Sequence, residues 1–181
     1  MFLFFYYFIE HTFCKDGDIM NKLSKLFDLL ESENINFFFA NLKLIRKLGM
    51  YSNRNGNPTI VIDSSIKYNK IKLTEILSEE LGHHFTTVGY LSNINTYQDE
   101  LKRNKSENQA LKWATNFLIS EEEICSLVME DLTVDEMAAR CEVSKEFFLK
   151  RLEFLSLEKN FVKLSNGSTL VLTNLPIFYV S

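Results

Sequence analysis

The sequence contains few cysteines. Cys14, Cys125 and Cys141 are odd in number, widely spaced and free of any C-x-x-C pair. This pattern argues against a disulfide framework and against a cysteine zinc site. We therefore expect a reducing environment and predict a cytoplasmic location.

Positive charge is also scarce. The chain carries 20 lysines and arginines against 24 aspartates and glutamates, which gives a formal net charge of −4. No overall positive field would draw such a chain to nucleic acid or to an anionic membrane surface. We expect protein or small-molecule partners, no membrane attachment and no direct nucleic-acid binding.

No apolar run is long enough to form a transmembrane helix. The run that opens the sequence, MFLFFYYFI, is too short to span a bilayer as a helix. It has no basic residue ahead of it and no A-x-A-like cleavage site after it, so a signal peptide is poorly supported. We expect residues 1–19 to be a doubtful leader and translation to begin at Met20.

Hydrophobic residues make up 46% of the 181 residues, which is enough to build a core. Apolar spacing of i, i+3, i+4 and i+7 alternates with short aromatic or β-branched runs, and an Asn-Gly turn at 55–56 joins two of these runs. The pattern predicts an α+β fold with a small, mostly antiparallel sheet packed on helices. The first predicted helices span residues 20–32, 72–85 and 98–119.

The last third of the sequence carries several helix-start signals. Two S/T-x-x-E capping boxes and a further serine cap predict three helices, and an Asn-Gly pair predicts a closing β-hairpin. The capping residues are Ser120 with Glu123, Thr133 with Glu136, and Ser144, and the hairpin turns at 166–167. We expect Trp113 and Phe117 to lie in the core, and Cys125 and Cys141 to be small buried apolar residues.

Residues 78–85, SEELGHHF, approach the zinc-peptidase pattern H-E-x-x-H. Glu80 and His83 fit that frame, but Glu79 stands where the first histidine belongs. Residues four apart share one side of a helix, so Glu79 and His83 can approach one ion together. Glu80 falls on the apolar arc of the helix, where a carboxylate needs a partner, and a metal-bound water is one candidate.

The next helix shows a similar anomaly, because Glu107 lies on a stripe of apolar residues and is expected to point inward. Glu79, His83 and Glu107 can therefore make a three-ligand site with a fourth position for water, and Glu80 would be the general base. Several alternatives stay open. Asp99 or Glu100 could replace Glu107 as third ligand, Glu107 could pair with Lys72 or Lys105, Glu79 could be an ordinary solvated carboxylate, and His84 is expected to be a hydrogen-bonded core histidine.

EILSEELGHHFTTVG followed by SENQALKWATNFLIS resembles the ImmA/IrrE family of metallo-endopeptidases, which combine an H-E-x-G-H helix with a later helix that supplies the third ligand. The likeness covers roughly residues 20–125. It implies a zincin-like fold, with His83 and Glu107 as ligands, Glu80 as catalytic base and Glu79 in the place of the missing ligand. It also implies, for many members, cleavage of a helix-turn-helix transcriptional repressor of a phage or mobile element.

The glutamate at position 79 has consequences for the metal. Two carboxylates and one histidine leave a Zn²⁺ site formally neutral, so its water should be less acidic and activity should shift to higher pH. A harder ligand set would also tolerate Mn²⁺ or Fe²⁺.

These observations predict a metallopeptidase domain over residues 20–125, and helix-turn-helix-like helices with a β-hairpin over residues 126–181. In residues 132–157 the acidic side chains offset the basic ones, which favours packing or substrate docking over DNA binding. We predict a metal-dependent endopeptidase. The alternative is a non-catalytic regulatory module that binds a repressor or DNA through residues 132–157.

Overall fold

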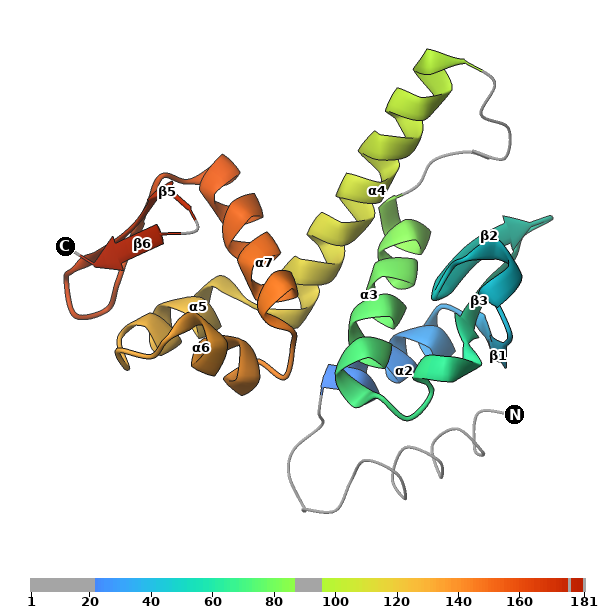
Figure 1. The fold of residues 1–181 in the computed structure, drawn as a ribbon, viewed down its shortest axis with the longest axis horizontal. Helices are drawn as coiled ribbons and strands as arrows, with labels where there is room; N and C mark the ends of the chain where they lie inside the picture. Colours follow the sequence, from blue (N-terminus) through green and yellow to red (C-terminus); the bar gives the residue numbers. More distant parts are fainter. Residues whose placement is uncertain (1–21, 87–95, 176, 181) are drawn as a thin grey trace. The chain divides into compact units, whose positions relative to one another are not determined.

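The computed structural model describes residues 22–86, 96–175 and 177–180, and the predicted leader and start at Met20 lie outside these ranges. The chain divides into two compact units, Met1–Ala110 and Leu111–Ser181, and the division falls within helix α4, Tyr97–Leu118. Figure 1 shows both units. Among the described residues no helix is long and apolar enough to cross a membrane.

The first unit contains a three-stranded sheet of order β1-β3-β2. β2 (Gly49–Arg54) and β3 (Asn57–Asp63) are antiparallel and joined at Asn55 and Gly56, whose φ angles of 54° and 76° suit a tight hairpin turn. β1 (Asn36–Ala40) pairs with β3 in parallel, which the sequence pattern did not indicate. The other strand pairs in the described residues are antiparallel, so the predicted α+β class and mostly antiparallel pairing are confirmed.

Two helices pack with this sheet (Figure 1). α2 (Lys22–Ser32) buries one face of leucines and a phenylalanine, and α3 (Lys70–Thr86) buries the arc that includes Leu73, Leu77 and Leu81. The helix predicted over 72–85 is therefore confirmed, as is the helix predicted over 20–32 from Lys22 onward, where the described residues begin. The ring of Phe27 on α2 meets that of Phe37 on β1 edge to face, with centroids 5.3 Å apart.

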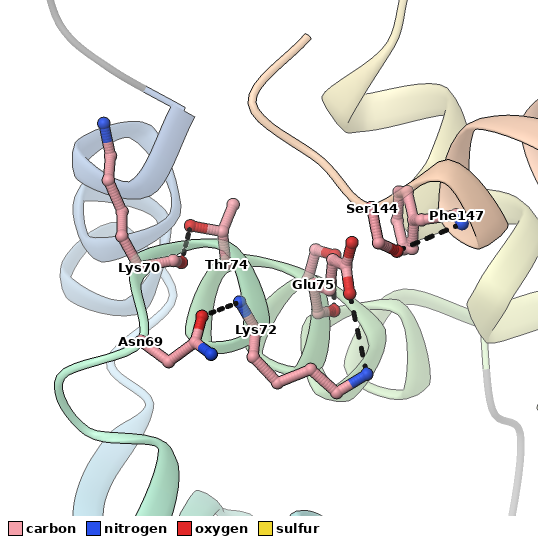
Figure 2. Close-up of polar contacts among 8 residues, drawn as sticks. Asn69, Lys70, Lys72, Thr74, Glu75, Ser144 and Phe147 are labelled. Atoms are coloured by element: carbon pink, nitrogen blue, oxygen red, sulfur yellow. Dashed lines mark hydrogen bonds and ion pairs between the residues drawn. The ribbon is translucent and has the colours of Figure 1, made fainter. Parts of the chain in front are cut away.

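Polar side chains fix the start of α3 (Figure 2). The amide of Asn69 caps the helix by accepting a hydrogen bond from the backbone N–H of Lys72 at 3.0 Å. One turn later the Thr74 hydroxyl donates to the Lys70 carbonyl at 2.8 Å, and the Lys72 ammonium lies 3.6 Å from buried Glu75. Because its start is fixed, α3 has a defined register against the sheet.

The second unit continues from the end of α4 into helices α5 (Glu121–Val128), α6 (Val134–Arg140) and α7 (Lys145–Glu158), then strands β4 (Phe161–Lys163), β5 (Thr169–Asn174) and β6 (Ile177–Val180). The three predicted caps all accept a backbone N–H, and Thr133 with Glu136 forms the complete reciprocal box. Figure 2 shows the bond to Ser144. The predicted hairpin is β4–β5, and β6 adds a third antiparallel strand.

Two predictions about the core of this unit need correction. Cys141 is fully buried as expected, but Cys125 is only half-buried. Trp113 is also half-buried, and Phe117, which is 37% exposed, stacks on it with ring centroids 5.1 Å apart. The reason is helical geometry, since the buried stripe of α4 runs through Ala110, Ala114 and Leu118 and leaves the aromatic pair on its flank.

Candidate metal centre and active site

Helix α3 presents two adjacent rows of polar side chains to two different neighbours. Glu79 and His83, one turn apart, form the row on the side of α4. Glu80 and His84 form the row on the side of β2, where they meet Gly49 and Tyr51 respectively. The candidate site therefore lies where one helix is covered by a strand on one flank and by a second helix on the other.

Glu80 is buried against the backbone of β2. A methyl group placed on Gly49 would lie 2.5 Å from Oε1 of Glu80, so only glycine leaves room for the carboxylate at this point. Glu80 is 8% exposed, as the apolar arc predicted. Burial raises its pKa to about 7, the neighbouring carboxylate of Glu79 adds to the rise, and His83 opposes it. A carboxylate with this pKa can accept and return a proton near neutral pH.

His83 and Glu107 meet across the crossing of α3 and α4. His83 Nε2 lies 3.0 Å from Glu107 Oε2. The helices can approach this closely because Gly82 lies against the backbone of Ala110, where any side chain would collide with the carbonyl oxygen. Glu107 is 45% exposed in its side chain, so the prediction that it points into the core is wrong. Its carboxylate instead extends along the helix surface to the imidazole.

The charges around this pair are coupled. Burial lowers the pKa of His83, but the hydrogen bond to Glu107 and the charges of Glu80, Glu107 and Glu79 outweigh it, so the pKa is raised overall. The same hydrogen bond holds the pKa of Glu107 below its usual value. Burial raises the pKa of Glu79, and the charge of Glu107 raises it further. A bound cation would relieve the repulsion among these carboxylates.

The donor atoms of His83 and Glu107 fit a divalent ion. Two ligands with bonds of 2.0–2.2 Å at a tetrahedral angle lie about 3.4 Å apart. The two donor atoms are 3.0 Å apart, so a small separation would admit the ion. The charges of both residues influence the pKa of Glu79. Glu79 is not placed to bind the same ion, because among the described side chains no group of three or more histidines, cysteines, aspartates or glutamates could hold a metal ion. The structure thus brings two of the three predicted ligands together.

The other residues that the sequence suggested as a third ligand or as partners of Glu107 lie elsewhere. Asp99 accepts hydrogen bonds from the N–H and hydroxyl of Thr96 at the start of α4, and Glu100 is exposed. Lys72 pairs with Glu75, and Lys105 points into solvent. None of these residues is part of the contact between His83 and Glu107.

His84 belongs to a separate cluster. Its Nδ1 lies 3.0 Å from the Tyr51 hydroxyl and its Nε2 lies 3.5 Å from Oε2 of Glu33. It is hydrogen-bonded as expected, but it is only half-buried and does not lie in the core. Tyr51 and Gly49 carry no sequence motif that marks them as neighbours of α3. Positions 49 and 51 are two apart on a strand, so they lie on the same face. Only the packing of β2 on α3 shows that this face meets Glu80 and His84.

One comparison with known proteins gives a match. A family model described as the IrrE N-terminal-like domain, a peptidase family, matches residues 30–153. No curated protein and no solved structure matches the chain significantly. The match spans more than half of the chain and includes Glu79, Glu80, His83 and Glu107.

Proposed function

Because the chain belongs to the peptidase family of the IrrE N-terminal-like domain, we propose that it is a metal-dependent endopeptidase. The observation that carries the proposal is the buried carboxylate of Glu80, with a pKa of about 7, beside the pair of His83 and Glu107. Perturbed titratable groups of this kind are typical of catalytic sites. A helix that needed only to pack would gain nothing from them.

In this mechanism His83 and Glu107 would hold the metal, with Glu79 as the third expected ligand. The ion, which we expect to be Zn²⁺, or alternatively Mn²⁺ or Fe²⁺, supplies Lewis-acid catalysis and lowers the pKa of a water molecule. Glu80 accepts a proton from the attacking water at its carboxylate and returns it to the nitrogen of the departing amine. Burial against Gly49 keeps bulk water from the Glu80 carboxylate and so maintains its raised pKa.

The first test is metal content by elemental analysis of protein purified without chelators or a histidine tag. We expect about one ion per chain, lost in His83→Ala and in Glu107→Ala. His84→Ala and Glu100→Ala are matched controls. His84→Ala removes the imidazole next to His83, and Glu100→Ala removes a carboxylate from α4, the helix that carries Glu107. A wild-type protein that takes up no Zn²⁺, Mn²⁺ or Fe²⁺ would refute the proposal.

The second test is catalysis. Glu80→Gln should keep the metal and lose peptide cleavage, whereas Glu75→Gln, at another buried carboxylate of α3, should keep both. Glu79→His should restore the usual two-histidine set and move the pH–rate profile toward lower pH. An unchanged profile would show that Glu79 does not influence the site.

The proposed substrate is a helix-turn-helix transcriptional repressor of a phage or mobile element. The support is the resemblance to ImmA/IrrE metallo-endopeptidases, many of which cleave such repressors. The test is incubation with a repressor encoded beside the gene, with mass spectrometry of the fragments. Cleavage by the wild type and not by Glu80→Gln is the expected result.

A non-catalytic regulatory module is the second candidate. The direct bond between His83 and Glu107 favours it, since such a bond stabilises the helix crossing without an ion. Binding of DNA through α6 and α7 is less well supported, because Lys145 pairs with Asp135 and Lys150 pairs with Glu153. Arg151 is buried, with its Nε–H donating to the Ile119 carbonyl.

A further inference from the structure

Residues 43–48, KLIRKL, form an exposed loop with an unusual composition. We call this segment the 43–48 loop. Leu44 is 98% exposed, Ile45 is 52% exposed and Leu48 is 37% exposed. Aliphatic side chains in one short segment rarely stay this open to water without a binding role.

The 43–48 loop has a fixed shape. Asp63, at the end of β3, holds both of its ends, because its carboxylate accepts the N–H of Leu42 and its own N–H donates to the carbonyl of Leu48 at 2.8 Å. Between them lies a short 3₁₀ turn, Lys43–Ile45, closed by Arg46 at a φ of 54°. Non-glycine residues adopt this conformation only where the surrounding structure holds them in it. The exposed side chains are therefore presented by a preorganised backbone, which lowers the entropic cost of binding.

Positive charge accompanies the apolar side chains. Lys43, Arg46 and Lys47 are all exposed and form no ion pair with any side chain that the structure describes. From residue 34 to residue 62 the sequence has no aspartate or glutamate, although the whole chain has 24. The 43–48 loop thus carries three exposed positive side chains, which attract acidic ligands over a short range.

The 43–48 loop adjoins the candidate active site. It leads directly into Gly49, against which Glu80 is packed. Burial is the main influence on the pKa values of Glu79 and Glu80, and Lys47 is among the charges that oppose it. Lys47 also precedes Gly49, the residue packed against Glu80, by only two positions. A polypeptide held at the 43–48 loop would reach the site within a few residues.

We propose that the 43–48 loop is a docking site for an acidic, leucine-rich segment of the protein substrate. This inference rests on the proposed peptidase function and adds the chemistry by which the substrate is selected. Glutamates or aspartates of the partner face Lys43, Arg46 and Lys47, and its aliphatic side chains cover Leu44 and Ile45. A flat anionic membrane fits less well, because it would also face the carboxylates of the site, whereas a peptide can place neutral residues there.

The test is fluorescence anisotropy of a short labelled peptide made of glutamate, leucine and serine, titrated with the full chain. A second peptide has lysine in place of every glutamate, and a third has serine in place of every leucine. The protein carries Glu80→Gln so that no peptide is consumed. The variants are Lys43→Glu with Lys47→Glu, Leu44→Ser with Ile45→Ser, and, as the control of equal charge change, Lys102→Glu with Lys105→Glu, which are exposed on α4.

We expect the first peptide to bind, with affinity falling as salt is added, and each loop variant to bind it about tenfold more weakly. The control variant should bind the first peptide with unchanged affinity. The two altered peptides should bind more weakly. No binding, equal binding of the lysine peptide, or an equal loss in the control variant would overturn the proposal. So would tighter binding to phosphatidylserine vesicles than to the peptide.

The binding assay needs neither metal nor cleavage. Its result therefore tests the docking site independently of the proposed peptidase function. Metal uptake and catalysis without peptide binding would leave the peptidase in place and reject the docking site. Peptide binding by a protein that takes up no metal would reject the peptidase and also the claim that the bound segment belongs to a substrate.

Discussion

Two buried carboxylates of the first unit are treated in opposite ways. Asp63 is 3% exposed and Glu80 is 8% exposed. Hydrogen bonds from the Ser65 side chain and from the N–H groups of Leu42 and Ser65 lower the pKa of Asp63, whereas burial raises that of Glu80 to about 7. Asp63 is ionised and fully used in holding the backbone together. Glu80 is kept available for a proton.

The difference shows that burial alone does not identify a functional carboxylate. The surrounding donors decide, because N–H groups that point at a carboxylate stabilise its charge and their absence destabilises it. The N–H groups of α3 form hydrogen bonds within the helix. The residue of β2 opposite Glu80 is Gly49, which has no side chain to donate a hydrogen bond. The contrast can be tested by changing Asp63, Glu80 or the strand β2 that packs on α3, one at a time.

Asp63→Ala should have the largest effect. It leaves the N–H groups of Leu42 and Ser65 without their acceptor, and we expect the melting temperature to fall by about 10 °C. Because the pKa of Asp63 is lowered on folding, its contribution is present above its ordinary pKa of 3.8 and is lost on acidification. Ser65→Ala, which spares the bond to Leu42, is the control. An equal loss in both variants would show that the tie to Leu42 contributes little.

Gly49→Val should come next. The added carbons overlap Oε1 of Glu80 and Cγ2 of Ile76, so strand and helix must separate, and we expect the melting temperature to fall by about 6 °C. Glu80→Ala in the same chain removes part of the overlap and should restore part of the loss. Ser52→Val, on the same strand, is the control. If the double variant gained nothing, Glu80 would not occupy the space that Gly49 leaves.

Glu80→Gln should stabilise the metal-free protein at alkaline pH. The folded protein holds a proton on Glu80 between pH 4.5 and about 7 that the unfolded chain has lost, so stability declines as pH rises through this window. Glutamine mimics the protonated form, and at pH 8 we expect a gain of about 1 to 2 kcal/mol, or about 4 °C. Thermal melts at pH 5 and pH 8 measure it. A gain of equal size at both pH values would contradict the raised pKa.

Tyr51→Phe should have the smallest effect. It removes the hydroxyl bonded to His84 but keeps the ring, and we expect a loss of about 1 kcal/mol, or about 3 °C. Metal content should stay unchanged, because His84 lies on the row away from Glu107. Loss of the metal in Tyr51→Phe would show that the two rows of α3 are not independent.

Local sequence patterns predicted the elements well. Capping residues such as Thr133 and Ser144 act within one helical turn, so their effect can be seen in the sequence without the fold. The burial of Glu80 was equally local, because its place on the apolar arc follows from the helical period. The same argument failed for Glu107 and Phe117, which lie at the edge of a stripe where packing decides the exposure.

Contacts between elements were out of reach. The hydrogen bond from the N–H of Leu42 to the carboxylate of Asp63 spans 21 residues, and no sequence pattern around either residue indicates it. Gly49 gave no signal either, because a glycine at the start of a strand is common and its role depends on which helix packs against it. The parallel partner of β1 was hidden for the same reason. The contact between His83 and Glu107 was indicated across 24 residues, first by the apolar stripe on which Glu107 lies and then by the resemblance to a family.

The order β1-β3-β2 also affects how this region folds. The hairpin of β2 and β3 closes over two residues and can form on the order of microseconds, whereas β1 has no partner in the sheet until β3 exists, and its Asn36 pairs with Thr59 much further along. The backbone N–H and C=O groups of β1 therefore stay open to water, or to strands of other chains, until β3 emerges. The 43–48 loop likewise cannot take its native shape until Asp63 has closed both of its ends.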